Sequence, residues 1–141
     1  MKFYIDTNIF IYAATDNGEL GKGARAIIKM LEAGIFSGAT STITLSEIMY
    51  NIKKRMGKEA SINVGQALLR MNNLLVADFD KSIAHASVYT ASEHNLPPQD
   101  AIHFATMGGL GIREIITEDK DFGNVKGIKR RSIRDIVEKF A

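Results

Sequence analysis

The chain has 141 residues, and 18 lysines and arginines against 16 aspartates and glutamates give it a formal net charge of +2. This length suits one domain, expected over residues 1–141, and 45% hydrophobic with 24% charged residues is the composition of a folded globular protein. The sequence has no cysteine, which excludes disulfide scaffolds, thiolate zinc sites, iron–sulfur clusters and cysteine nucleophiles and favours an intracellular, cytoplasmic protein.

No stretch approaches the roughly 20 consecutive apolar residues that cross a bilayer, so no membrane association is expected. Asp6 interrupts the apolar start of the sequence too early for a signal peptide. A total charge of +2 is by itself too small to indicate a surface that binds nucleic acid.

Strands and helices alternate in the first half of the sequence. The apolar, β-rich residues 3–5 predict a strand, which Asp6-Thr7-Asn8 follow as a turn before a short helix from Ile9. Apolar residues at helical spacing predict helices over 19–31, stopped by Gly34, over 44–56, ended by Gly57, and over 61–71. Between them, residues 36–43 and 74–77 predict the second and third strands.

The second half continues the alternation. A helix is predicted over 80–94, before the break at Asn95-Leu96-Pro97-Pro98, and another over 99–107, stopped by Gly108 and Gly109. Residues 115–117 predict a fourth strand, 127–129 are a candidate fifth, and Ser132 caps a closing helix over 132–140. The pattern predicts a three-layer α/β/α sandwich with a mainly parallel central sheet of four to five strands, in which the functional crevice lies at the carboxyl ends of the strands.

Four acidic residues stand where strands end or helices begin: Asp6, Glu47, Asp100 and Asp119. Each has an ordinary structural explanation. Asp6 and Asp119 suit turns or a helix cap, Thr44-Leu45-Ser46-Glu47 matches a capping box, and Asp100 suits the first turn of a helix. Strand ends and helix starts can share one edge of a sheet, however, so the four carboxylates are expected to converge there.

Four close carboxylates cannot all stay ionised without a cation, because like charges raise one another's pKa. Oxygen ligands without a histidine or cysteine cluster favour Mg²⁺ or Mn²⁺, ions that activate water and stabilise the charge on a phosphodiester. Glu47, Asn51 and Lys54 share one polar helix face that suits the same substrate. His103 lies one turn from Asp100 and could reach it, although a lone histidine is more often packed or exposed than a metal ligand.

At this point the sequence resembles the PIN domain family, and within it the VapC-type toxin ribonucleases. The resemblance runs essentially end to end, and its segments occur in the family's order. They are Tyr4-Ile5-Asp6-Thr7-Asn8, Leu45-Ser46-Glu47-Ile48, Gln99-Asp100-Ala101-Ile102-His103-Phe104-Ala105 and Thr117-Glu118-Asp119-Lys120-Asp121-Phe122. The resemblance implies a PIN-like fold and a Mg²⁺- or Mn²⁺-dependent endoribonuclease, whose catalytic and metal-binding acids are Asp6, Glu47, Asp100 and Asp119.

The resemblance also implies roles for polar neighbours and for partners. Thr7, Asn8 and Thr117 match residues that support the acids rather than bind metal, and Asp121 is either an outer ligand through water or structural. Toxins of this type form homodimers and are silenced by a small antitoxin protein, so both partners are expected. The predicted helices over 19–31 and 44–56 are candidates for an interface.

RNA is expected to contact two basic clusters. The alternative is that such charge runs are solvated faces. Without the four proposed ligands, 12 acidic residues remain against 18 basic ones, a balance of +6 that suits an RNA-binding body around a negative pocket. The clusters are Lys53, Lys54, Arg55 and Lys58, and Lys129, Arg130 and Arg131 with Arg134.

Other functions remain as alternatives. A haloacid-dehalogenase-type phosphatase would need an acid two residues after Asp6, where Asn8 stands, and a receiver domain would need an early acidic pair and a late lysine that are not evident. A catalytically silent PIN-like RNA-binding module would use the four acids for structure. A housekeeping PIN nuclease that processes RNA would have the same site as a toxin.

Overall fold

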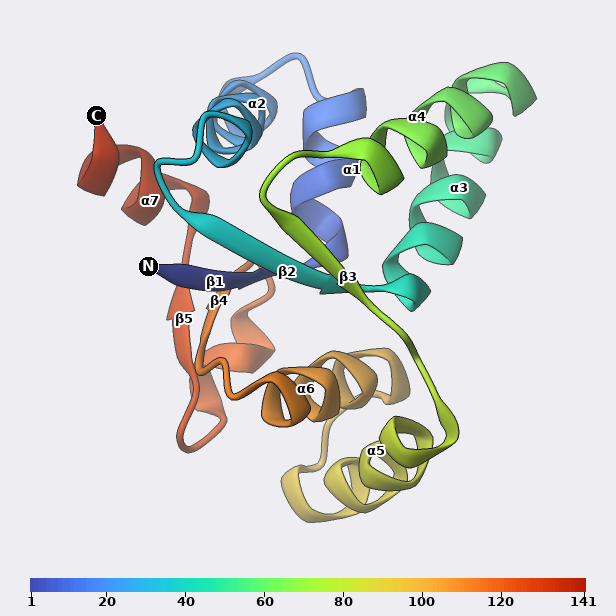
Figure 1. Cartoon of the computed structure of the whole chain (residues 1–141), viewed down its shortest axis with the longest axis vertical. Helices are drawn as coiled ribbons and strands as arrows, with labels where there is room; N and C mark the ends of the chain where they lie inside the picture. The colour runs from blue at the N-terminus through green and yellow to red at the C-terminus, as the bar shows by residue number, and fades with distance from the viewer.

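The computed structural model describes all 141 residues and shows a five-stranded parallel sheet between two layers of helices (Figure 1). The strand order is β3-β2-β1-β4-β5, and every neighbouring pair is parallel, so all strands end at the same edge. The predicted α/β sandwich with a parallel sheet is confirmed. The strands are β1 (Lys2–Ile5), β2 (Ser37–Ser41), β3 (Leu74–Ala77), β4 (Glu114–Ile116) and β5 (Lys129–Arg131).

The helices divide between the two faces of the sheet. In Figure 1, α1, α2, α4 and α7 lie above the sheet, with α3 beside α4, while α5 and α6 lie below it. None of the helices is both long enough and apolar enough to span a bilayer. The helices are α1 (Thr7–Thr15), α2 (Glu19–Glu32), α3 (Thr42–Met56), α4 (Lys58–Arg70), α5 (Lys81–His94), α6 (Pro98–Leu110) and α7 (Ile133–Phe140), with a short 3₁₀ helix η1 (Lys120–Asn124).

The central strand β1 joins two hydrophobic cores. Successive side chains of a strand point to opposite faces, so Phe3 and Ile5 pack under α1, α2 and α7 while Tyr4 packs against α6. All three side chains are fully buried. The end of β1 is therefore a rigid position inside the molecule, and Asp6 follows it directly.

Two boundaries near the acids differ from the sequence prediction. Helix α1 begins at Thr7, so the predicted turn Asp6-Thr7-Asn8 is wrong: Asp6 is the N-cap and accepts a hydrogen bond from the Thr7 N–H. Helix α3 begins at Thr42, and the side chain of its N-cap Ser41 accepts from the Ile43 N–H. The predicted capping box at Thr44 is therefore wrong, which leaves Glu47 in the second turn of α3 free for other contacts.

The remaining differences concern ends of elements. Helix α6 passes through Gly108 and Gly109 and stops at Gly111, which adopts a left-handed φ of 70° that glycine tolerates. Helix α4 begins at Lys58, three residues before its predicted start. Strand β5 lies two residues later than the candidate over 127–129, because its register is set by pairing with β4, as between Ile115 and Arg130.

Candidate active site

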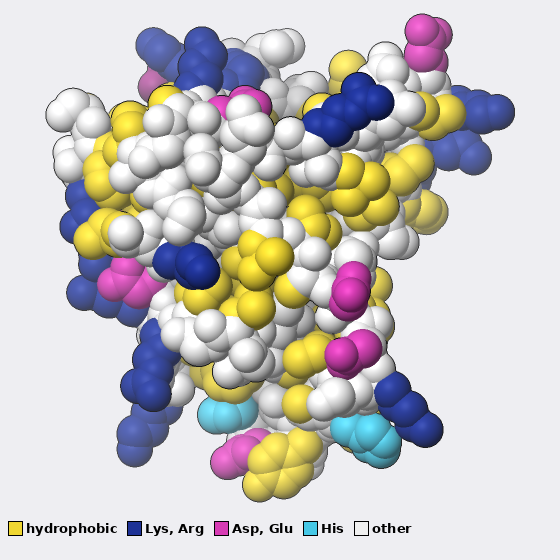
Figure 2. All heavy atoms as spheres, in the orientation of Figure 1, with side chains coloured by type: hydrophobic (Ala, Val, Ile, Leu, Met, Phe, Trp, Pro, Cys, Tyr) yellow, Lys and Arg dark blue, Asp and Glu magenta, His cyan; other side chains and the backbone are white.

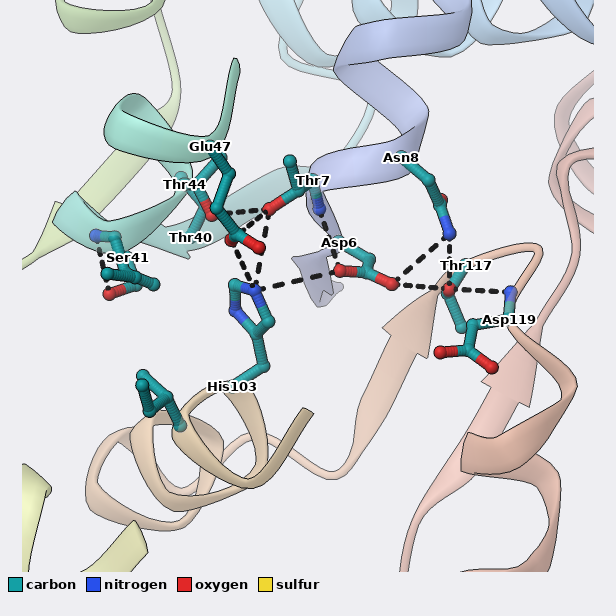
Figure 3. A network of polar contacts seen from close by, with 12 residues as sticks. Asp6, Thr7, Asn8, Thr40, Ser41, Thr44, Glu47, His103, Thr117 and Asp119 are labelled. Carbon is teal, nitrogen blue, oxygen red and sulfur yellow. Dashed lines mark hydrogen bonds and ion pairs between the residues drawn. The ribbon is translucent and has the colours of Figure 1, made fainter. Parts of the chain in front are cut away.

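Asp6 occupies the end of the central strand with three hydrogen-bond donors around its carboxylate (Figure 3). It accepts from the Thr7 N–H at 2.8 Å, from the Thr117 hydroxyl at 2.6 Å and from Asn8 Nδ2 at 3.3 Å. The residue is only 5% exposed. Burial raises the pKa of Asp6, while His103 and the Thr117 hydroxyl act in the opposite direction.

Thr117 connects the first acid to the last one. It follows β4, the strand beside β1, and is fully buried. Its hydroxyl donates to Asp6 and accepts from the Asp119 N–H at 2.9 Å and from Asn8 Nδ2 at 3.1 Å. Thr117 therefore contacts both Asp6 and the backbone of Asp119, and Asn8 contacts Asp6 and Thr117.

Glu47 reaches the same site from α3. Its Oε1 accepts from the Thr7 hydroxyl at 2.8 Å and lies 3.1 Å from His103 Nε2. Burial would raise the pKa of Glu47, but its hydrogen bonds to His103 and Thr7 and the charge of His103 together lower it below its ordinary value. Glu47 is therefore held as a carboxylate in the second turn of its helix, beside Thr7 of α1.

The contacts of His103 were not predicted from the sequence. The residue is 1% exposed, and its Nδ1 lies 2.6 Å from the Tyr4 hydroxyl. Its Nε2 faces Glu47 and lies 3.8 Å from Asp6 Oδ1, so its contacts are with Tyr4 and Glu47 rather than with Asp100. Burial lowers the pKa of His103, but the hydrogen bond to Glu47 and the charges of Asp6 and Glu47 outweigh it and raise the pKa. Only the alternation of β1, which turns Tyr4 toward α6, could have indicated this contact.

Asp100, Asp119 and Asp121 form the one group of three acids in the chain whose carboxylate oxygens lie within 4.8 Å of one another. Asp100 lies in the first turn of α6, and Asp119 caps η1 by accepting from the Asp121 N–H at 2.9 Å. Burial and the neighbouring carboxyl of Asp119 raise the pKa of Asp100 to about 7. A set of oxygen donors that repel one another fits a hard divalent cation such as Mg²⁺ or Mn²⁺.

The two basic clusters differ in their surroundings. Arg130 and Arg131 are half-buried and face acceptors of their own chain, since Arg130 Nε donates to the Asp119 carbonyl at 3.2 Å and an Arg131 nitrogen lies 3.4 Å from Glu114. Lys129 and Arg134 are exposed, but the Arg134 guanidinium pairs with Glu138 at 2.9 Å. In Figure 2, most of the Lys and Arg side chains in view stand at the periphery of the face. The cluster on α3 and the start of α4 is exposed throughout: Lys53, Lys54, Arg55 and Lys58.

A sequence profile of the PIN domain matches residues 3–128, a range that contains all four predicted acids. The chain belongs to the PIN domain family. The resemblance predicted from the sequence is thereby confirmed. No curated protein matches the sequence.

Solved structures similar to this PIN domain include VapC proteins. VapBC2 from Rickettsia felis, bound to a promoter DNA fragment, matches with a TM-score of 0.72 at 18% identity over 94% of this chain and 98% of that chain. VapC20 from Mycobacterium tuberculosis, described as a toxin that cleaves the sarcin-ricin loop, matches with a TM-score of 0.72 at 18% identity over 86% and 92%. At these identities the likeness shows the fold alone.

A toxin–antitoxin complex from Klebsiella pneumoniae is similar at a higher identity. It matches at 28% identity with a TM-score of 0.64 over 89% of this chain and 94% of that chain. The match therefore covers most of both chains.

Proposed function

We propose that this chain is a metal-dependent endoribonuclease and the toxin of a type II toxin–antitoxin pair. The observation that carries the proposal is the meeting of Asp6, Glu47, Asp100 and Asp119 at the carboxyl edge of one parallel sheet. They come from the end of β1, from α3, from α6 and from the segment after β4. Buried hydroxyl groups and an imidazole contact Asp6, Glu47 and Asp119, and a carboxylate oxygen of Asp100 lies within 4.8 Å of one of Asp119. Such a site suits phosphodiester hydrolysis and has no serine or cysteine nucleophile in it.

A divalent ion, Mg²⁺ or Mn²⁺, would be held by Asp100 and Asp119, with Asp6 beside them and Asp121 at the rim. Bound there, the ion would supply the acidity that makes water a nucleophile at neutral pH and the charge that stabilises a phosphodiester in displacement. The side chains around the acids orient them: Thr117 and Asn8 orient Asp6, and Thr7 and His103 orient Glu47. We expect hydrolysis to leave a 5′-phosphate and a 3′-hydroxyl.

The RNA strand is proposed to run from the acids along α1 and α3. These helices run side by side in the same direction. The Thr7 hydroxyl donates to Glu47 near their starts, and eight residues further along each helix the Thr15 hydroxyl accepts from the Arg55 guanidinium. Eight residues of helix span about 12 Å, so Arg55 and its basic neighbours Lys53, Lys54 and Lys58 lie within reach of a short single strand that enters the site. Lys129, Arg130 and Arg131 remain candidates beside Asp119, although two of them are engaged within the chain.

The partners are proposed from the similar structures. The Rickettsia and Klebsiella structures are described as a VapBC assembly and a toxin–antitoxin complex, which supports an antitoxin as the partner of this chain. A homodimer is part of the same proposal, because the resemblance to VapC-type toxins implies one. A cytoplasmic location is also proposed, because a toxin of this kind meets its RNA and its antitoxin in the cytoplasm. A housekeeping nuclease would have the same site and would lack the antitoxin.

The proposal is tested by replacing single acids. Purified chain should cut RNA in Mg²⁺ or Mn²⁺ and stop when EDTA is added. Asp6→Asn and Asp100→Asn should fold, as judged by circular dichroism, and lose cleavage. Folded Asp6→Asn or Asp100→Asn protein that cuts RNA at the full rate would refute the assignment, and a wild-type chain that binds RNA without cutting it would favour the silent binding module.

A further inference from the structure

We propose that His103 is a positioning residue that holds Glu47 away from the metal ion, so that the site binds one divalent ion on its Asp100–Asp119 side. Glu47 then acts on the substrate without being a ligand. This inference rests on the proposed function only in assuming that the acids bind a divalent ion. It deepens that proposal by dividing the four acids between two tasks.

The contact between Tyr4 and His103 determines which ring nitrogen carries a proton. The Tyr4 hydroxyl is fully buried and lies 2.6 Å from Nδ1, and a phenol is protonated at neutral pH. If the phenol donates to Nδ1, the proton of the neutral ring is on Nε2. If Nδ1 donates to the phenol oxygen, Nε2 must also carry a proton. An unprotonated Nε2 is a hydrogen-bond acceptor, and it would lie 3.1 Å from a second acceptor, the Glu47 carboxylate oxygen.

Nε2 is therefore an N–H donor in both arrangements. A protonated ring nitrogen cannot ligate a metal ion, so His103 is excluded as a ligand while this contact persists. The same N–H engages Glu47 Oε1, which also accepts from the Thr7 hydroxyl at 2.8 Å. Two donors thus compete with any ion for this oxygen.

The same ring nitrogen also lies near Asp6. Nε2 lies 3.1 Å from Glu47 and 3.8 Å from Asp6 Oδ1, so an ion bound by both of these carboxylates would come close to the Nε2 N–H. Figure 3 shows one ring nitrogen of His103 facing both carboxylates, with Asp119 on the far side of Asp6. Glu47 does not belong to the acids whose oxygens gather within 4.8 Å, which are Asp100, Asp119 and Asp121. One ion at that group accounts for the arrangement, and Glu47 remains free to face the substrate.

Metal binding without RNA provides the first test. Isothermal titration calorimetry with Mn²⁺ should give one ion per chain for the wild type. Asp119→Asn should weaken Mn²⁺ binding by roughly tenfold or more, since even outer-shell changes cost that much, whereas Glu47→Gln should leave the Mn²⁺ Kd close to the wild-type value. Two ions per chain, or equal weakening by Glu47→Gln and Asp119→Asn, would overturn the inference.

Nuclear magnetic resonance of ¹⁵N-labelled histidine provides a direct readout of the ring. Nε2 of His103 should be protonated before Mg²⁺ is added and remain so afterwards. Loss of the Nε2 proton on Mg²⁺ addition is the signature of ligation and would contradict the proposal. Neither this measurement nor calorimetry needs RNA, so a chain that fails to cut RNA would refute the proposed function and leave this inference standing.

Cleavage kinetics distinguish positioning from a structural role. His103→Leu removes the donor and should lower kcat for RNA cleavage without raising KM and without weakening Mn²⁺ binding, and His103→Gln, whose amide can donate to Glu47, should recover part of kcat. Tyr4→Phe retains the packing of β1 and should lower kcat in the same direction, which covers a His103→Leu variant that fails to fold. Weaker Mn²⁺ binding by folded His103→Leu would refute the positioning role of His103. Wild-type kcat in both Tyr4→Phe and His103→Gln would refute it as well.

Discussion

Replacing Thr117 by valine removes one hydroxyl group from the centre of the acidic site at nearly constant volume. The side chain is fully buried, and its oxygen makes three hydrogen bonds, of which the shortest is the 2.6 Å bond to Asp6 Oδ2. The other two come from the Asp119 N–H at 2.9 Å and from Asn8 Nδ2 at 3.1 Å. Asp6, itself 5% exposed, would have one hydrogen-bond donor fewer.

The free energy of unfolding should fall by about 1.5–3 kcal/mol near neutral pH, the range for a hydrogen bond to a charged group. The effect should shrink in acid, because the pKa of Asp6 is already raised by burial and a protonated carboxyl group no longer needs the donor. RNA cleavage should also fall, because both the orientation of Asp6 and the position of Asp119 depend on this hydroxyl.

Urea unfolding in EDTA measures the stability, and a cleavage assay in Mn²⁺ measures the activity. Ser61→Ala is the matched control, since Ser61 is 3% exposed and its hydroxyl donates to the neutral Met49 carbonyl at 2.7 Å, away from the acids. It should cost about 1 kcal/mol at every pH and leave cleavage intact. The reasoning is refuted if Thr117→Val loses stability independently of pH and cuts RNA at the wild-type rate.

Two further predictions concern pH and RNA binding. Without metal, the melting temperature should fall as the pH rises from about 5 to about 8. The pKa values of Asp100 (about 7), Asp6 and His103 are all raised in the folded chain. A group with a raised folded-state pKa stabilises the fold at low pH, and this stabilisation is lost as the pH rises through that pKa. Saturating Mn²⁺ should oppose this loss and Asp100→Asn should flatten it in scanning fluorimetry, while a metal-free melting temperature that rises over this range would contradict the assignment. Lys54→Ala with Arg55→Ala, in a cleavage-deficient Asp6→Asn background, should weaken RNA binding and reduce the slope of log affinity against log salt by about 1.4, which fluorescence anisotropy measures. Lys2→Ala, at the start of β1, is the control, and an equal effect from it would exclude a specific phosphate contact.

The sequence predicted the neighbourhood of the site because strand ends in a parallel sheet share one edge. Asp6 and Asp119 each follow a buried apolar run, and β1 and β4 pair directly, so the two residues meet through Thr117. Glu47 could be placed only by the fold, because its local pattern matches a capping box equally well. Ser41 caps α3 instead, and the Thr44 hydroxyl is engaged with Thr40 at 2.8 Å and Thr7 at 3.2 Å.

Contacts between distant residues account for what the sequence could not predict. The hydrogen bond between Tyr4 and His103 joins residues 99 positions apart, and the alternation of β1 indicates only the face of the sheet on which Tyr4 lies. A run of basic residues likewise does not reveal its acceptors, and Arg130 and Arg131 face Asp119 and Glu114 once β5 pairs with β4. The end of α6 depended on Gly111 rather than on the two preceding glycines, because only Gly111 adopts the left-handed conformation that ends the helix.

The chemistry of the RNA ends tests the central claim most directly. Purified chain, incubated with RNA and Mn²⁺, should release products with a 5′-phosphate and a 3′-hydroxyl, and both EDTA and the Asp100→Asn substitution should abolish them. Products that form in EDTA, or that carry a 2′,3′-cyclic phosphate, would show cleavage without the acidic metal site and would contradict the account.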